Sequence, residues 1–217
     1  MKEPSLNDER VSSYFDKVAD RFDAIYRSDK SFEKKLVDGL FRSVVHRRFA
    51  YTMELLGEVK GKSILDVGCG SARYGIQLAT QGAKVHGLDF AAGMVDMAIK
   101  AAENADVSDM CSFTECDFLS WNSEKSYDAC LAIGFFDYIQ EASVFLQRMN
   151  EIKAKNYVFS FPKRWTFRTL PRWIRLNASG CPVYFYDSRQ ISNLLVGAGW
   201  SDFNIKSLSR DYLVHIY

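Results

Sequence analysis

The chain has 217 residues, of which 47% are hydrophobic and 25% are charged, and its formal net charge is +1. This length suits a single domain over residues 1–217, and a charge near zero gives no support for nucleic-acid binding. No apolar run approaches membrane-spanning length, and residues 1–10 are too polar for a signal peptide. We therefore expect a cytoplasmic protein without an integral membrane segment.

Apolar residues before residue 60 recur at helical spacing, which predicts an N-terminal helical cap over residues 1–59. From residue 60 onward apolar strands alternate with helices, a pattern typical of an α/β fold with helices on both faces of a parallel sheet. The last two strands should form a hairpin, giving a seven-stranded, mostly parallel sheet with an antiparallel terminal strand. The expected strands are Ser63–Val67, Lys84–Leu88, Cys111–Glu115, Tyr127–Ile133, Asn156–Phe161, Phe203–Leu208 and Tyr212–Tyr217, and the expected helices are Ala72–Thr80, Gly93–Ala105, Gln140–Ile152 and Ser188–Ala198.

The most informative stretch is residues 64–75, which read ILDVGCGSARYG. An apolar strand runs here into a glycine turn and then a helix, and such a turn lets the backbone approach a nucleotide-like ligand. Asp66 lies two residues before the first glycine, where it would repel a phosphate and attract an ammonium group. Asp89, at the end of the next expected strand, can accept both hydroxyls of a ribose. The predicted ligand therefore carries a cationic group and a ribose but no nearby phosphate.

These residues resemble the motifs of class I, Rossmann-like S-adenosylmethionine-dependent methyltransferases of the small-molecule type. In that family an Asp-x-Gly-x-Gly loop holds the methionine end of the cofactor, S-adenosyl-L-methionine, and Asp66, Gly68 and Gly70 match this loop. The resemblance implies that Asp89 binds the ribose. In layout it implies a Rossmann-like core over residues 60–217, with an acceptor-side insertion at residues 162–187.

The same resemblance implies further cofactor contacts. An acid after the third strand usually meets the adenine amino group, and Asp117 matches it, with Phe118 as an apolar neighbour of the ring. Two positions depart from the family pattern. Ala72 replaces a frequent third glycine, and Ala91 replaces a frequent serine cap, a loss of about 1 kcal/mol. The other cofactor-binding residues expected are Cys69, Arg73, Phe90, Met94, Ile133, Gly134 and Tyr14.

Methyl transfer needs few catalytic side chains, because the cofactor supplies the leaving group and the protein mainly aligns and dehydrates the reactants. After the fourth expected strand, Asp137 and Tyr138 would face the reaction, and the backbone at residues 133–134 would meet the cofactor. Asp137 is the candidate general base, which is required only when the nucleophile arrives protonated. The alternative is that the neighbouring phenylalanines pack the following helix and Asp137 caps it.

Tyr14 lies in a segment that resembles the N-terminal helix of many small-molecule methyltransferases, which closes over the cofactor. Its ring would attract the sulfonium there, so Tyr14 is also a candidate catalytic residue; ordinary burial on a helix face is the alternative. Arg47, Arg48 and Arg73 are candidates for pairing with the methionine carboxylate, although an arginine at any one of these positions is more often a surface residue.

Residues 152–186 contain no acidic residue but seven basic ones, with aromatic residues between them. This segment follows the fifth expected strand, where an acceptor would bind, so it predicts an anionic small-molecule acceptor or, more weakly, peripheral membrane contact. The alternative is a solvated helix anchored by its tryptophans. The basic residues are Lys153, Lys155, Lys163, Arg164, Arg168, Arg172 and Arg175.

The preferred function is transfer of a methyl group to an oxygen, nitrogen or carbon atom of a small molecule. The layout of residues 160–200 is loosely similar to magnesium-protoporphyrin methyltransferases and to tailoring methyltransferases of quinone or sugar biosynthesis, which does not select an acceptor. One alternative is an NAD-dependent oxidoreductase. The sequence argues against it, because Arg73 occupies the position where the dinucleotide-binding motif needs a third glycine. Another is a non-catalytic partner protein that binds S-adenosylmethionine. Scattered histidines and the lack of a Cys-x-x-Cys pair predict no metal site.

Overall fold

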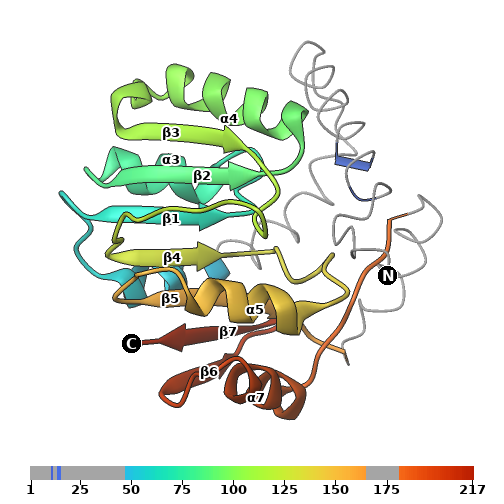
Figure 1. The fold of residues 1–217 in the computed structure, drawn as a ribbon. Helices are drawn as coiled ribbons and strands as arrows, with labels where there is room; N and C mark the ends of the chain where they lie inside the picture. The colour runs from blue at the N-terminus through green and yellow to red at the C-terminus, as the bar shows by residue number, and fades with distance from the viewer. Residues whose placement is uncertain (1–10, 12–13, 16–46, 165–180) are drawn as a thin grey trace, which may run out of the picture.

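The computed structural model describes residues 11, 14–15, 47–164 and 181–217, and its centre is a seven-stranded sheet (Figure 1). The strands are β1 (Ser63–Val67), β2 (Lys84–Asp89), β3 (Cys111–Glu115), β4 (Ala129–Ala132), β5 (Tyr157–Pro162), β6 (Phe203–Ser207) and β7 (Asp211–Ile216). Their order is β3-β2-β1-β4-β5-β7-β6, and each neighbouring pair is parallel except the two that include β7. The predicted α/β fold class is confirmed, including its antiparallel terminal strand.

Helices cover both faces of this sheet. They are α3 (Arg73–Thr80), α4 (Ala92–Asn104), α5 (Ala142–Asn150) and α7 (Ser188–Gly197), and residues 47–56 form a further helix before β1. On one face α3 and α4 pack against β2 and β3, and on the other α5 packs against α7. The arrowheads of the parallel strands point to one edge of the sheet in Figure 1, and that of β7 points the opposite way. The carboxyl ends of the parallel strands therefore share an edge with the first residue of β7.

Both faces of the sheet are buried, which explains why its central strands are apolar almost throughout. In β4, Cys130 and Ala132 join the core on the α5 side, whereas Ala129 and Leu131 join the core on the α3 side. This alternation follows from the two-residue period of a strand. A polar side chain within such a strand is cut off from water, so its hydrogen-bonding groups need a partner in the protein or in a ligand.

The observed boundaries differ from the predicted ones by at most two residues. β4 begins at Ala129 rather than Tyr127, because Tyr127 forms only an isolated bridge with Ala154. α7 begins directly after Asp187, where Asp187 and Gln190 form a capping box. Short-range signals therefore located the elements well.

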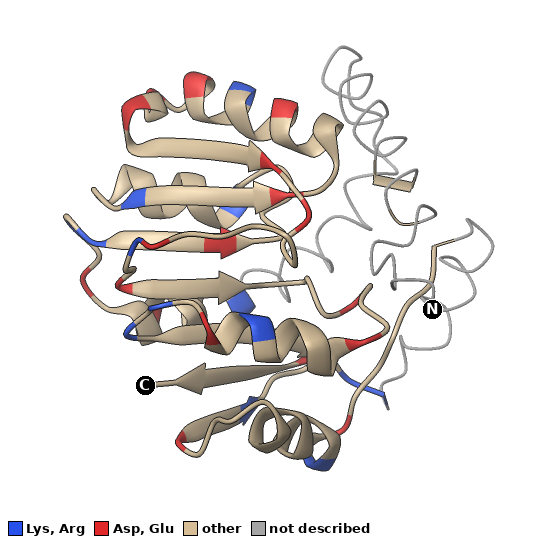
Figure 2. Cartoon of the chain, in the orientation of Figure 1, with Lys and Arg blue, Asp and Glu red and all other residues tan. Residues whose placement is uncertain are grey.

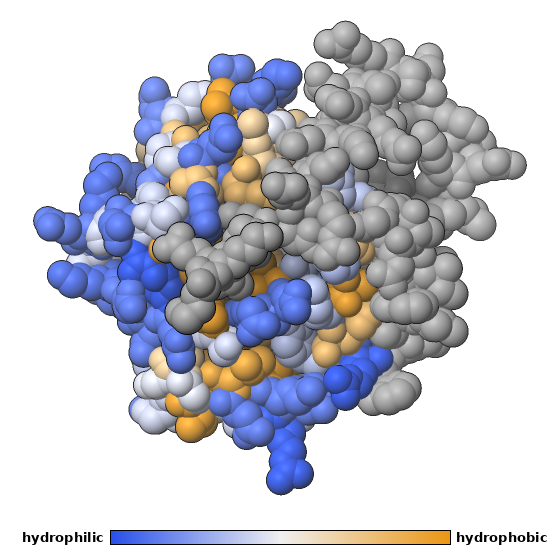
Figure 3. Space-filling view, turned by 45° about the vertical axis from the view of Figure 1, so that its right-hand side comes forward, coloured by the Kyte–Doolittle hydropathy of each residue, from blue (hydrophilic) through white to orange (hydrophobic). Residues whose placement is uncertain are grey.

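Much of the predicted N-terminal cap and of the insertion at residues 162–187 lies outside the described residues, so the single-domain organisation stays a prediction. Within the described ranges no helix is long and apolar enough to span a membrane, and no three His, Cys, Asp or Glu side chains are grouped to hold a metal ion. The described surface seen in Figure 3 is largely hydrophilic with separate apolar patches. The exposed large apolar residues of the described part are Ile99, Val144, Val196 and Tyr217.

Ala72 adopts a left-handed backbone conformation, with φ of +55°, where the glycine turn enters α3. The side chain is completely buried, so the methyl group at the position of the family's third glycine is accommodated. The left-handed conformation costs a non-glycine residue about 1 kcal/mol or more. The chain therefore carries local strain at the start of the helix nearest to the predicted ligand.

We expect Ala72→Gly to raise the free energy of unfolding by about 1 kcal/mol, because glycine adopts this conformation without steric cost. Urea unfolding followed by circular dichroism measures the change. Ala79→Gly, within the same helix, is the matched control and should lower the free energy of unfolding by about 1 kcal/mol. Equal destabilisation by the two substitutions would contradict the assignment of strain to Ala72.

Candidate functional site

The glycine turn after β1 is tied to the end of β2. The backbone N–H groups of Gly68 and Cys69 both donate to the carbonyl of Leu88, at 2.8 and 3.0 Å. Gly68 and Gly70 have φ of +67° and +54°, in the left-handed region that favours glycine. A Cβ on Gly68 would also lie 2.4 Å from Cδ2 of Phe135, whereas a Cβ on Gly70 would meet nothing within 4 Å. The ring of Phe135 therefore fills the space beside the first glycine of the turn, whereas the space beside the second glycine is open.

Asp89, the last residue of β2, braces the same turn. Its Oδ2 accepts from the N–H of Gly70 at 2.8 Å, and its Oδ1 accepts from the N–H of Ala91 at 3.0 Å. Ala91 occupies the N-cap of α4 and offers no side-chain cap of its own, as the sequence predicts. The carboxylate expected to bind a ribose is thus held in one orientation by the turn beside it.

Asp66 lies on β1, only 3% exposed, and Figure 2 shows acidic residues towards the same ends of β1 and β2. Burial raises the pKa of Asp66 to about 7, and the negative charge of Asp89 adds to the shift. Its Oδ2 lies 3.9 Å from the place that a Cβ on Gly75 would take, so the carboxylate faces the first turn of α3. A nearby cation would favour the ionised form of Asp66, which fits the predicted ligand.

A second turn follows β4 at the same edge of the sheet. Gly134 has φ of +80°, and its N–H donates to Oγ of Ser160 at 2.7 Å. Ser160 is completely buried within β5, so this bond partners a hydroxyl that is cut off from water. A side chain of the neighbouring strand β5 therefore holds the turn in place.

The two phenylalanines of this turn pack in different places. The ring centroid of Phe135 lies 5.3 Å from that of Phe145 on α5. This is the packing against the following helix that the alternative interpretation predicted for both phenylalanines. The ring of Phe136 instead stacks 4.4 Å from that of Phe161 on β5. Phe135 is therefore the ring that joins α5 to the glycine turn.

Asp137 is 4% exposed but does not cap α5. That helix begins at Ala142, with Glu141 at its N-cap, so the alternative that Asp137 caps it is wrong by four residues. The carbonyl of Asp137 accepts from the N–H of Tyr184 at 2.9 Å, which joins the turn after β4 to the segment before α7. Its role as a general base stays a prediction.

A set of apolar residues that we call the apolar cluster brings predicted site residues together. Tyr14, Phe90 and Tyr138 meet there, although they come from the N-terminal region, the end of β2 and the turn after β4. Met94 packs in an adjoining cluster beside Ala91. The residues of the apolar cluster are Val11, Tyr14, Phe15, Phe90, Tyr138, Cys181, Val183 and Phe185.

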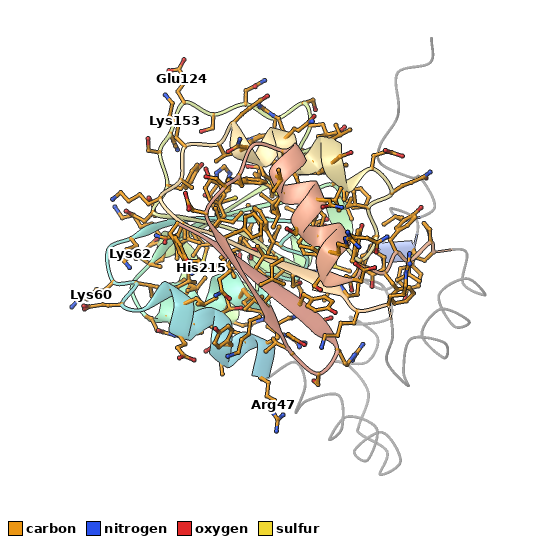
Figure 4. The ribbon with its side chains drawn as sticks, turned by 90° about the horizontal axis from the view of Figure 1, so that it is seen from below. Arg47, Lys60, Lys62, Glu124, Lys153 and His215 are labelled. Carbon is orange, nitrogen blue, oxygen red and sulfur yellow. The ribbon has the colours of Figure 1, made fainter. Side chains whose placement is uncertain are left out.

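Among the three candidate arginines, Arg48 is the one with its side chain in the site. Arg47 and Arg73 are exposed, and Figure 4 shows Arg47 pointing away from the fold. Nε of Arg48 donates to the hydroxyl of Tyr74 at 3.2 Å, and Nη1 donates to Oδ2 of Asp211 at 3.3 Å. These bonds tie the helix at residues 47–56 to α3 and β7.

The guanidinium of Arg48 stays charged although it is largely buried. Burial lowers the pKa of Arg48, but the hydroxyl of Tyr74 and the charge of Asp211 raise it. Asp137 also raises it, and the pKa of Arg48 is raised overall. Nη2 lies 3.8 Å from the place that a Cβ on Gly134 would take. A fixed positive charge therefore adjoins the turn after β4.

Three further predicted cofactor residues have side chains with protein partners. Oδ1 of Asp117 accepts a backbone N–H two residues further on, at 3.1 Å. Phe118 is 5% exposed and its ring stacks 6.4 Å from that of Phe145 on α5. Sγ of Cys69 lies 2.8 Å from the place that a Cβ on Gly87 would take, so this side chain points over the sheet. Their contacts with a cofactor stay predictions.

The described basic residues of segment 152–186 lie at different edges of the sheet. Nζ of Lys155 pairs with Oδ1 of Asp128 at 2.7 Å, just before the amino ends of β5 and β4. Lys153 also precedes β5, so the expectation that the whole segment faces an acceptor is wrong for these two lysines. Nζ of Lys163 donates to the carbonyl of Leu208, between β6 and β7. Outside the described residues lie Arg168, Arg172 and Arg175.

The fold brings to the site three polar residues that the sequence motifs do not indicate. Ser160 carried a signal, because it is a hydroxyl within a strand that is buried along its whole length. The sequence contains no signal for Asp211. This residue reaches the edge formed by the carboxyl ends of the parallel strands only because β7 runs in the opposite direction. Tyr74 reads as an ordinary buried position of α3.

Part of the chain is similar to proteins of a known family. Residues 64–155 match the methyltransferase domain family. A ubiquinone biosynthesis O-methyltransferase from Azorhizobium caulinodans is 30% identical over 118 residues, which are 54% of this chain and 46% of that protein. An uncharacterized protein from Haemophilus influenzae is 27% identical over 104 residues, 46% of this chain and 38% of that one. The chain thus spans less than half the length of these curated relatives.

Solved structures share the fold. Magnesium protoporphyrin IX methyltransferase from Synechocystis PCC 6803, with bound SAH, has a TM-score of 0.72 and 22% identity, covering 94% of this chain and 96% of that one. Geranyl diphosphate C-methyltransferase from Streptomyces coelicolor A3(2) has a TM-score of 0.69 and 13% identity, covering 87% and 84%. At such identities these likenesses show the fold. Residues 64–155 thus match the methyltransferase domain family, and the chain has the Rossmann-like fold of these solved structures, as its sequence predicts.

Proposed function

We propose that this protein transfers a methyl group from S-adenosyl-L-methionine to a small-molecule acceptor. The observation that carries the proposal is the pair of buried carboxylates at the glycine turn, Asp66 and Asp89. The match to the methyltransferase domain family supports it. Similar proteins include an O-methyltransferase of ubiquinone biosynthesis and a C-methyltransferase of geranyl diphosphate, so the proposal names no single acceptor atom.

The residues at this edge fit that cofactor, whose bound sulfonium would supply the activated methyl group. Asp66 would attract the ammonium of the methionine part, and Asp89 would accept from the ribose hydroxyls. Asp117 and Phe118 would meet the adenine. The open backbone at Gly70 supports this assignment, because it leaves room for close approach. A nicotinamide dinucleotide fits less well, since its pyrophosphate would meet two carboxylates.

Arg48 is the cation that we assign to the methionine carboxylate. Its guanidinium is oriented by Tyr74 and Asp211, and Nη2 adjoins Gly134 beside the glycine turn. Arg73, the candidate nearest to the glycines in sequence, is exposed at the first position of α3. A buried arginine that is already held in place loses little side-chain freedom when it binds a carboxylate.

On the acceptor side we propose roles for Tyr14, Asp137 and Tyr138. A nucleophile that arrives protonated would give its proton to Asp137, and the two tyrosines would shape the apolar wall beside it. The finer proposal of an anionic acceptor depends on Arg164, after β5, and on basic residues outside the described part. The match to small-molecule methyltransferases supports an acceptor of modest size.

Thermal melting with S-adenosylmethionine, S-adenosylhomocysteine and NAD tests the proposal. The first two should stabilise the protein by about 2.7 kcal/mol at 100 times their dissociation constants, and NAD should leave it unchanged. Stabilisation by NAD alone would instead indicate an oxidoreductase. Binding without consumption of the methyl donor, whatever acceptor is offered, would indicate a non-catalytic partner protein.

We expect cofactor affinity to depend on pH through Asp66. Its pKa of about 7 in the free protein means that a cationic ligand, which favours the carboxylate form, must displace a proton near neutrality. The dissociation constant for S-adenosylmethionine should therefore fall as pH rises through about 7, with release of roughly half a proton at that pH. Calorimetry in buffers of different ionisation enthalpy measures both quantities.

Asp66→Asn should flatten this pH dependence, because the amide does not titrate. Asp128→Asn, which removes a carboxylate at the opposite edge of the sheet, is the control and should keep it. A pH profile that survives Asp66→Asn would show that another group releases the proton.

We expect Arg48→Ala to weaken S-adenosylmethionine binding by about 10- to 100-fold, because it removes a charge-assisted hydrogen bond to the methionine carboxylate. Binding of 5′-methylthioadenosine, which lacks the amino-acid part, should change little. Arg47→Ala, at the exposed neighbouring position, is the matched control. Equal losses for both ligands would mean that Arg48 supports the fold through Asp211 and does not bind the carboxylate.

A further inference from the structure

Phe15 packs in two apolar clusters at once. It belongs to the apolar cluster with Cys181 and Val183, and it also lies against Ala91 and Met94 in the adjoining cluster. Among the described residues it is the ring that appears in both groups. The sequence singled out its neighbour Tyr14 and not this residue.

The contacts of Phe15 reach both halves of the proposed site. Ala91 and Met94 follow Asp89 at the end of β2, on the side proposed for the ribose. The ring of Phe15 meets that of Tyr138 edge to face, with centroids 5.0 Å apart and an interplanar angle of 90°. Tyr138 follows Asp137 on the acceptor side, so one side chain contacts both halves of the proposed site.

The segment before α7 completes this contact. Cys181 and Val183 are buried in the apolar cluster, 0% and 9% exposed, and the next residue, Tyr184, donates its N–H to the carbonyl of Asp137. The acceptor-side wall thus consists of the turn after β4 and residues 181–185, with Phe15 packed against both. Loss of this ring would leave the wall without its contact to the cofactor side.

We propose that Phe15 is a positioning residue that couples the cofactor half of the site to the acceptor half. A cofactor held by Asp89 fixes Ala91 and Met94, and these hold Phe15 against Tyr138 and the segment before α7. A bound cofactor therefore stabilises the packed acceptor wall, so the acceptor binds more tightly once the cofactor is in place. This inference rests on the proposed function, and it is an energetic coupling in which each ligand favours the same packed arrangement.

Cys181 reports on this packing without any knowledge of the acceptor. Its thiol is completely buried in the apolar cluster, so an alkylating reagent reaches it only when the cluster opens. Cys130 is also completely buried, but it lies in the centre of the sheet on β4 and reports on global unfolding. The two thiols together separate local opening from loss of the fold.

The experiment is timed alkylation with iodoacetamide, with and without saturating S-adenosylhomocysteine, and mass-spectrometric quantification of each cysteine. In the unmodified protein the ligand should slow alkylation of Cys181 by at least about tenfold relative to Cys130. In Phe15→Ala, Cys181 should react at least about tenfold faster, and the ligand should no longer protect it. Phe15→Leu, which keeps an apolar side chain, should restore part of the protection.

Val11→Ala is the matched control, because it shortens a side chain that belongs to the apolar cluster alone. Protection by the ligand should persist in this variant. The inference is overturned if the ligand fails to protect Cys181 selectively, if Cys130 changes in parallel, or if Phe15→Ala keeps the protection. A protein that shows no thermal shift with S-adenosylhomocysteine would refute the proposed function itself, which the melting curve detects separately.

Discussion

The site depends on one set of hydrogen bonds, those that hold the glycine turn on the end of β2. The N–H groups of Gly68 and Cys69 converge on the carbonyl of Leu88, and that of Gly70 donates to the carboxylate of Asp89. Three successive donors are thus committed to β2, so the turn is fixed before any ligand arrives. Because the left-handed conformations at both glycines aim these donors, the shape of the turn and the orientation of the acid are determined together.

This arrangement places charge where water has little access. Asp66 and Asp89 are both buried, and their mutual repulsion adds to the cost of ionising Asp66. A cationic ligand offsets this repulsion, and the unliganded protein offsets it by holding a proton near neutral pH. Arg48 has the complementary role beside the turn after β4, where an ion pair with Asp211 orients its positive charge. Charges of opposite sign therefore lie beside the two turns, as a ligand with an ammonium and a carboxylate requires.

Local signals in the sequence predict the fold and the cofactor half of this site. The spacing of Asp66, Gly68 and Asp89 needs only strand, turn and helix in succession, which short-range patterns encode. The choice between Arg47 and Arg48 could not be made in the same way, because it depends on how the helix at residues 47–56 is rotated against the sheet. The different packing of the two adjacent phenylalanines could not be predicted either, because it depends on contacts with the neighbouring strand.

The position of Asp211 shows the limit more clearly. All parallel strands end at the edge where the site lies, so their contributions follow the strands in sequence and can be anticipated. β7 runs the other way, and its first residue, Asp211, reaches that edge opposite Pro162 at the end of β5. Asp211 thereby meets Arg48, which is 163 residues away along the chain. Reversing a single strand therefore adds a residue to the site that no spacing rule would find.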